Sequence, residues 1–118
     1  MVKFVVLVKL REGADPDEFW KFWEEVHGPP HMVPGLIKYC INRVTKVVGG
    51  EPTFWGMAEQ WFDSEETLQK MLNSPKLRQA VEDAKRLPGG NFHDRTTDHQ
   101  VVLVEEKMLV EDGVLLKG

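Results

Sequence analysis

The chain has 118 residues, a formal net charge of −4 at pH 7, 42% hydrophobic and 29% charged residues, and a single cysteine, Cys40. This length suits one domain with one core, so we treat residues 1–118 as a single domain. The acidic balance and the lack of a basic patch argue against nucleic acid. No apolar run approaches the roughly 20 residues that span a bilayer. One cysteine allows no internal disulfide, and we expect a cytoplasmic protein.

The first quarter of the chain predicts a strand followed by a helix. Residues 2–10, VKFVVLVKL, are rich in β-branched side chains and predict a strand with apolar groups on both faces. Asp15 and Pro16, a capping carboxylate before a proline, predict a helix over 16–27. Its apolar residues recur at i, i+3, i+4 and i+7 and form one buried face: Phe19, Phe22, Trp23 and Val26. Gly28 and two prolines end the helix, with Gly28 as a left-handed cap.

Two further strands are predicted over residues 36–48 and 54–62. A loop with glycine and proline joins them, so an antiparallel pair is expected. Strict alternation in the first strand puts Ile37 on the same face as Tyr39. In the second strand Glu59 shares a face with three large apolar residues, Trp55, Met57 and Trp61.

The remaining elements complete an α+β order. Ser64 opens a second helix, and Ser74 restarts it to about Leu87. Residues 98–105 predict a fourth strand, and 108–116 predict a small terminal hairpin.

Strand, helix, strand, strand, helix, strand is the split βαβ order of a ferredoxin-like subunit with a four-stranded antiparallel sheet. Helices on such a sheet cover one face, yet the strands carry apolar groups on the other face too. We therefore predict a homodimer formed sheet to sheet. Residues 106–118 are a terminal extension that we expect to act as a dimer arm.

Five segments stand in order along roughly residues 1–105: VKFVVLVKLREG, DEFWKFWEEVHGP, PGLIKYCINRV, MAEQWFDSEETL and DHQVVLVE. Together they resemble the EthD family of the dimeric α+β barrel superfamily. The resemblance implies a ferredoxin-like subunit, a dimeric α/β barrel built from facing sheets, and a cleft in each subunit between helices and sheet.

The resemblance also implies acid–base chemistry on small cyclic or aromatic molecules, usually without a metal. Members and near relatives include methylmuconolactone isomerases, fungal anthraquinone-pathway dehydratases, polyketide cyclases and a protein of ether-degradation operons. The wider superfamily adds cofactor-free monooxygenases and haem-binding enzymes. A shared fold does not by itself fix the function.

Three side chains are candidates for catalysis. His27, at the mouth of an apolar groove, titrates near neutral pH and would be the general acid or base, unless it only caps the last carbonyls of its helix. Tyr39 would hydrogen-bond a ligand carbonyl or stabilise an enolate, unless it is a core tyrosine with a satisfied hydroxyl. Glu59, among aromatic side chains, would act as an acid or base if buried, or else lie at an edge or pair with Arg43.

Four further residues are expected to contact the substrate: Trp23, His31, His99 and Trp61. Trp23 belongs first to the core and second to a ring-stacking platform. His31 follows the prolines and is expected on an exposed loop, whereas His99 begins the fourth strand and could reach the cleft. The histidines lack the tight spacing of a metal site, so we predict no metal, and no cofactor.

These observations predict a homodimeric enzyme for metal-free isomerisation, cyclisation or dehydration of a cyclic or aromatic carbonyl compound. Two alternatives stay open. A non-catalytic ligand-binding or accessory protein would bind without proton exchange. A cofactor-free monooxygenase would consume oxygen, and a haem binder would show a Soret band.

Overall fold

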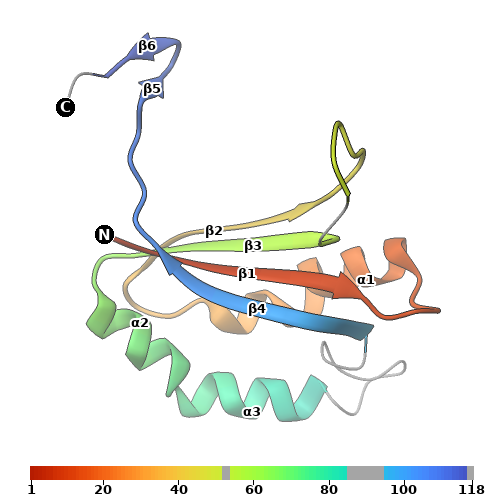
Figure 1. Cartoon of the computed structure of the whole chain (residues 1–118). Coiled ribbons are helices and arrows are strands. Elements are labelled where there is room, and N and C mark those ends of the chain that lie inside the picture. Colours follow the sequence, from red (N-terminus) through yellow and green to blue (C-terminus); the bar gives the residue numbers. More distant parts are fainter. Residues whose placement is uncertain (52–53, 85–94, 117–118) are drawn as a thin grey trace.

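The computed structural model describes residues 1–51, 54–84 and 95–116. In chain order the elements are β1 (Val2–Leu10), α1 (Pro16–Phe22), a turn of π-helix η1 (Trp23–His27), a 3-10 turn η2 (Pro29–His31), β2 (Leu36–Arg43), β3 (Gly56–Phe62), α2 (Glu65–Leu72), α3 (Pro75–Ala84), β4 (Thr96–Val104), β5 (Val110–Glu111) and β6 (Val114–Leu115) (Figure 1). The predicted end of the second helical segment near Leu87 lies outside the described residues.

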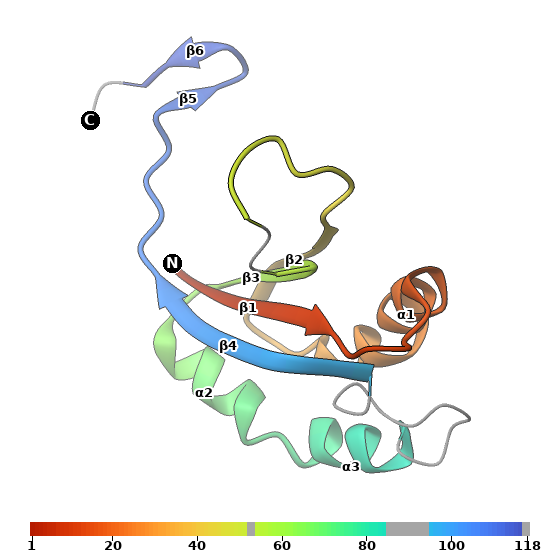
Figure 2. The same ribbon diagram turned by 45° about the vertical axis from the view of Figure 1, so that its right-hand side comes forward.

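The main sheet has four strands in the order β2-β3-β1-β4, and each neighbouring pair is antiparallel. The helices α1, α2 and α3 all lie on one side of it (Figures 1 and 2). This order confirms the predicted ferredoxin-like α+β subunit. We call the covered side of the sheet the helix face and the other side the open face.

Alternation along β3 separates the two faces. Its residues on the helix face are Gly56, Ala58, Gln60 and Phe62, and those on the open face are Met57, Glu59 and Trp61. Because directly paired residues share a face, Tyr39, opposite Gln60, lies on the helix face, and Lys3, opposite Trp61, lies on the open face.

The core fills the space between the helices and the helix face in two clusters. One contains Val8, Phe19, Phe22, Trp23 and Ala58, and the other contains Phe4, Phe62, Leu68, Met71 and Leu77. The predicted apolar face of the first helix is therefore confirmed. The N-cap is confirmed as well, because the Asp15 carboxylate accepts from the backbone N–H groups of Asp17 and Glu18 at 2.9 and 3.0 Å.

The prediction of a left-handed cap at Gly28 was wrong. Gly28 has φ −67° and ψ −53°, and its N–H donates to Trp23 O, five residues back, at 2.9 Å. The Schellman form of that cap needs an N–H on the residue after the glycine, and here that residue is Pro29, which has none. Glycine is needed for close approach instead, because a Cβ would lie 3.0 Å from Trp23 O.

The second strand departs from strict alternation. The pairing of β2 with β3 shifts between Leu36, opposite Phe62, and Lys38, opposite Trp61. Ile37 is therefore an extra, bulged residue, and 59% of it is exposed. The prediction that Ile37 shares the face of Tyr39 was wrong: Leu36 packs in the core on the helix face instead.

The strands on either side of the β2–β3 loop are shorter than predicted, since β2 ends at Arg43 and β3 begins at Gly56. Trp55 is held by hydrogen bonds from its N–H to Val8 O and from Val44 N–H to its own carbonyl, each 2.8 Å. Its ring meets that of Phe19 edge-on at 5.4 Å, so it packs toward α1 and does not share the face of Glu59.

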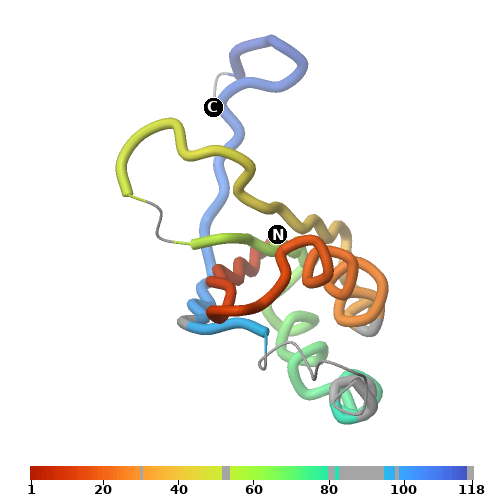
Figure 3. The backbone as a smooth tube through the Cα atoms, turned by 90° about the vertical axis from the view of Figure 1, so that its right-hand side faces the viewer, coloured from red at the N-terminus to blue at the C-terminus, as the bar shows by residue number. Residues whose placement is uncertain are grey.

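Two segments project from the side of the sheet that carries no helix. One is the loop that follows β2, and the other is the terminal arm, which we define as residues 105–116 and which contains β5 and β6 (Figures 1 and 3).

Candidate active site

A cavity of about 230 Å³ lies between the helical layer and the helix face of the sheet. Its polar lining consists of His27 from η1, His31 from η2, Tyr39 from β2, Gln60 from β3 and His99 from β4. The other lining side chains are apolar, and none of the described residues around it is Lys, Arg, Asp or Glu. The cavity therefore favours an uncharged ligand with a few polar groups.

His31 is held in one tautomer by the chain that precedes it. Its Nδ1 lies 3.0 Å from His27 O and 3.2 Å from Gly28 O. Carbonyl oxygens only accept, so Nδ1 carries the proton and Nε2 keeps its lone pair in the neutral ring. Burial lowers the pKa of His31, and the two backbone hydrogen bonds oppose this only in part. At neutral pH His31 is thus an uncharged base.

The expectation that His31 is exposed on a loop was wrong. The two prolines form a 3-10 turn, closed by hydrogen bonds from His31 N–H to Gly28 O and from Met32 N–H to Pro29 O, each 3.0 Å. This turn folds the ring of His31 back to 4.9 Å from the ring of His27.

His27 lies where the sequence placed it, at the end of the first helical segment and on the cavity wall. Its ring stacks on Phe22 at a centroid distance of 6.5 Å and an interplanar angle of 27°. Its backbone oxygen orients His31, so the two histidines form one unit.

Tyr39 presents a hydroxyl to the same cavity. Burial raises the pKa of Tyr39, and a hydrogen bond with the Trp23 side chain offsets this in part. The indole N–H only donates, so the Tyr39 oxygen is the acceptor in that contact, and its own proton can be given to a ligand. No residue in the described part of the chain accepts this proton. The Tyr39 ring also meets the His31 ring edge-on at 5.8 Å.

Gln60 is a site residue that the sequence analysis missed. It is 2% exposed and lines the cavity, yet its Oε1 has no hydrogen-bond partner among the described residues. A buried amide left unpartnered costs about 1–3 kcal/mol. The signal in the sequence was a single polar residue between Ala58 and Phe62 on an otherwise apolar strand face.

Sequence comparison agrees with this architecture. The family model for the EthD domain matches residues 11–89. The chain belongs to the EthD family. An EthD-family protein of Bacillus halodurans has a crystal structure that matches with a TM-score of 0.65 and 26% identity, covering 91% of this chain and 99% of that one.

Other matches to this EthD-family chain have lower identity. An uncharacterized 11.0 kDa protein from the thcB–thcC intergenic region of Rhodococcus erythropolis is 22% identical over 99 residues, or 83% of this chain and 96% of that protein. A dimeric ferredoxin-like protein of unknown function from Thermobifida fusca has a TM-score of 0.65 at 14% identity, with 87% and 88% of the two chains covered. SnoaB of Streptomyces nogalater, a cofactor-independent oxygenase, has a TM-score of 0.62 at 13% identity, with 91% and 93% covered.

His99 and Trp23 also line the cavity of the EthD-family chain, as their predicted contact with a ligand requires. His99 Nε2 is hydrogen-bonded to the hydroxyl of Thr96, which is 1% exposed. Trp23, 1% exposed, is first a core residue, as expected.

Glu59 and Trp61 of the EthD-family chain lie on the open face, and the sheet separates them from the cavity. Glu59 pairs with Lys3 Nζ at 2.5 Å and accepts from Asn42 Nδ2 at 3.0 Å. The alternative partner, Arg43, instead donates to Asp17 at 3.1 Å. The structure therefore does not bring Glu59 or Trp61 together with His27 and Tyr39, because alternation turns their side chains to the other face of β3.

Among the described residues of the EthD-family chain, no group of three or more His, Cys, Asp or Glu side chains is placed to hold a metal ion. In the same part of the chain no helix has the length and apolarity needed to cross a bilayer.

Proposed function

We propose that this EthD-family protein is a homodimeric enzyme that moves a proton on a small, uncharged cyclic or aromatic carbonyl compound. The reaction would be an isomerisation, cyclisation or dehydration. The observation that carries the proposal is the pairing, in one apolar cavity, of a neutral His31 with an open Nε2 and a Tyr39 whose O–H proton is available to a ligand.

In the proposed step His31 Nε2 removes a proton from the carbon next to the carbonyl group, and Tyr39 donates a hydrogen bond to the carbonyl oxygen. The negative charge that develops on that oxygen is stabilised by the Tyr39 O–H. The imidazolium then returns the proton to another atom of the ligand, so the enzyme ends unchanged. His27, the acid–base candidate from the sequence, holds the His31 ring through its backbone oxygen and can share the proton return from the same cavity wall.

The homodimer is supported by the uncovered open face and by the dimeric protein of Thermobifida fusca that shares the fold. The open face carries Leu7 of β1, half-buried beside the buried Val5 and between two lysines, and a second sheet would cover it. The cytoplasmic location stays a prediction.

The test uses 2-tetralone, an uncharged bicyclic ketone with acidic α-protons. Proton NMR in deuterium oxide measures the rate at which these protons exchange with the solvent. We expect the protein to accelerate the exchange, and His31→Gln to reduce the acceleration at least tenfold. Lys70→Gln, at an exposed position of α2 away from the cavity and from the open face, is the control and should exchange at the rate of the unmodified chain. Full exchange in both His31→Gln and His27→Gln would refute the proposal.

The same experiment separates the alternatives. Saturable binding of 2-tetralone without faster exchange would favour a ligand-binding or accessory protein. Oxygen consumption with the ketone would favour an oxygenase, a reading that the fold shared with SnoaB supports at 13% identity.

A further inference from the structure

A second hollow, which we call the edge groove, lies on the outer side of Trp23 and Tyr39. Its volume is about 310 Å³, and Met32, Leu36 and Ile41 line it beside those two residues. It lies along β2, an edge strand of the sheet. Met32, at the groove, is 79% exposed. The subunit thus leaves an apolar surface uncovered directly behind the wall of the candidate active site.

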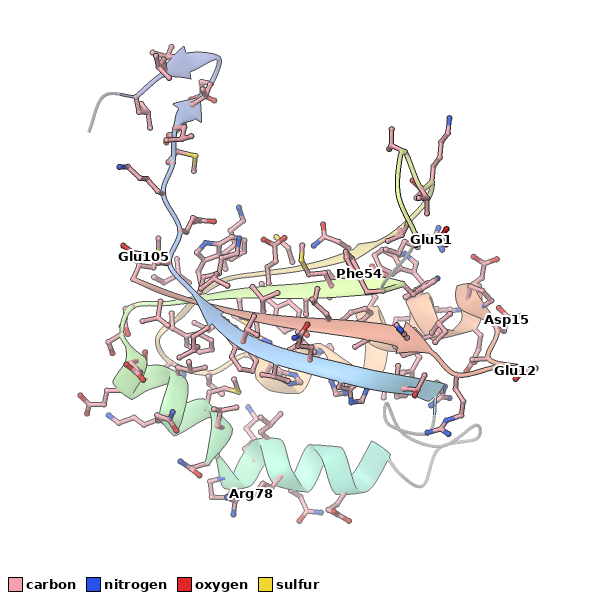
Figure 4. All side chains as sticks on the ribbon, in the orientation of Figure 1. Glu12, Asp15, Glu51, Phe54, Arg78 and Glu105 are labelled. Atoms are coloured by element: carbon pink, nitrogen blue, oxygen red, sulfur yellow. The ribbon has the colours of Figure 1, made fainter. Side chains whose placement is uncertain are left out.

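The terminal arm carries a matching surplus of apolar side chains. Six large residues of the arm are 39–69% exposed: Met108, Leu109, Val110, Val114, Leu115 and Leu116. Its two strands pair only with each other, and an isolated two-stranded hairpin is marginally stable in water. Figure 4 labels Glu105 at the root of the arm, which leads away from its own subunit. The hairpin therefore requires a surface that its own subunit does not provide.

The root of the arm is fixed in direction by Glu106. Its carboxylate accepts from Trp61 Nε1 at 2.8 Å and from Lys3 Nζ at 2.9 Å, both on the open face. The hydrogen bonds from Trp61 and Lys3 lower the pKa of Glu106, so the carboxylate stays charged at neutral pH. The arm accordingly rises from the open face, the side on which a second subunit would sit (Figure 3).

The length of the arm indicates how far it reaches. Facing sheets lie about 10 Å apart, whereas the five residue steps from Glu105 to Val110 can span about 17 Å. The hairpin would thus pass the plane of a partner's sheet and lie beside that partner's edge strands and helices. β4, which continues into the arm, and β2 are the two opposite edges of the sheet. A twofold axis parallel to the strands lays β4 of one subunit over β2 of the other.

We propose that the terminal arm of each subunit docks its apolar hairpin into the edge groove of the partner, a second copy of this chain. The proposal rests on the homodimer proposed above. Because Trp23 and Tyr39 line both the edge groove and the cavity, the partner's arm supports the outer side of the wall that holds the Tyr39 hydroxyl. Each active site would then be complete only in the dimer.

Disulfide cross-linking between two single variants tests this arrangement. In a Cys40→Ser background, a chain with Leu115→Cys is mixed with a chain with Met32→Cys and oxidised. We expect a cross-linked dimer in the mixture, and much less in either variant alone. Leu72→Cys, on a half-exposed residue of α2, replaces Met32→Cys as the control and should not cross-link to Leu115→Cys. The absence of a cross-link between Leu115→Cys and Met32→Cys would overturn the proposal.

Removal of residues 107–118 provides the second measurement. We expect the dissociation constant of the dimer, measured by analytical ultracentrifugation, to increase at least tenfold. The affinity for 2-tetralone should fall as well. Unchanged dimer affinity would overturn the arm proposal and leave the proton-transfer proposal standing. A monomeric full-length chain would refute the homodimer and the arm together. A shift of the Met32 methyl resonance on adding 2-tetralone, but not on dimerisation, would assign the groove to the small molecule and would also overturn the proposal.

Discussion

Burial shifts the pKa values of two polar residues of the cavity in opposite directions. It lowers the pKa of His31 and raises the pKa of Tyr39. Both shifts favour the uncharged form of the side chain. An uncharged histidine can accept a proton and an uncharged tyrosine can donate a hydrogen bond, so one apolar environment prepares a base and a donor at the same time.

The lowered pKa of His31 predicts how proton exchange depends on pH. The neutral form of His31 is the active one, and its pKa lies below the ordinary 6.5. Exchange of 2-tetralone should therefore be fully active above about pH 6.5 and decline as the pH falls through the lowered pKa. His31→Gln should remove this acid limb from a rate profile recorded between pH 4.5 and 8. A rate that rises on acidification would contradict the assignment of His31 as the base.

Gln60 carries a stability prediction because its buried oxygen has no hydrogen-bond partner in the part of the chain that the structure describes. Gln60→Leu removes the desolvated amide and should stabilise the fold by about 1 kcal/mol, which corresponds to a rise in Tm of roughly 4 °C for a chain of this size. The same change should weaken the binding of 2-tetralone if the amide contacts the ligand. Gln100→Leu, at an exposed position of β4, is the control for thermal unfolding and calorimetric titration. A destabilised Gln60→Leu variant would show that the amide already has a partner.

At the scale of elements, the sequence predicted the order and pairing of the strands well, because β-branched runs and caps are local signals. It also placed Glu59 and Gln60 on opposite faces of one strand, but no local pattern tells which face borders a cavity. For this reason the sequence analysis chose Glu59, and not Gln60, as a candidate site residue. Similarly, the prolines after Gly28 indicated a break in the helix. The 3-10 turn that brings His31 next to His27 depends on individual hydrogen bonds, which the spacing of apolar residues does not reveal.

The π-helical turn before the 3-10 turn is the element on which the two histidines depend. Gly28→Ala would place a Cβ 3.0 Å from Trp23 O. The carbonyl can move only by opening the turn, so we expect a loss of about 1–2 kcal/mol in unfolding free energy despite the higher helix propensity of alanine. Proton exchange should fall as well, because Gly28 O accepts from His31. Gly49→Ala, where a Cβ meets nothing within 4 Å, is the control for chemical denaturation and exchange. Equal stability in the two variants would contradict this reading of Gly28.

For the whole molecule, the proposed sheet-to-sheet dimer predicts that the stability depends on the protein concentration. When a dimer unfolds to two separate chains, its free energy of unfolding increases by about 1.4 kcal/mol for each tenfold rise in protein concentration. The same rise in concentration increases the Tm by a few degrees. Thermal unfolding between 1 and 100 µM should show this shift. Leu7→Lys, which adds a charge to the open face, should yield a monomer whose Tm does not depend on concentration. A constant Tm in the unmodified chain would contradict the dimer.

The bulge at Ile37 has a consequence for the length of the chain. Leu36 and Lys38 oppose neighbouring residues of β3, so deletion of Ile37 would leave every other residue of β2 opposite its present partner in β3 and Tyr39 still facing His31. Deletion of Cys40 would instead move Tyr39 one step along the strand, onto the side of Glu59. We therefore expect the strand to tolerate the loss of one residue before Tyr39 and not after it, so that related chains can differ in length at the bulge and still keep a tyrosine in the cavity.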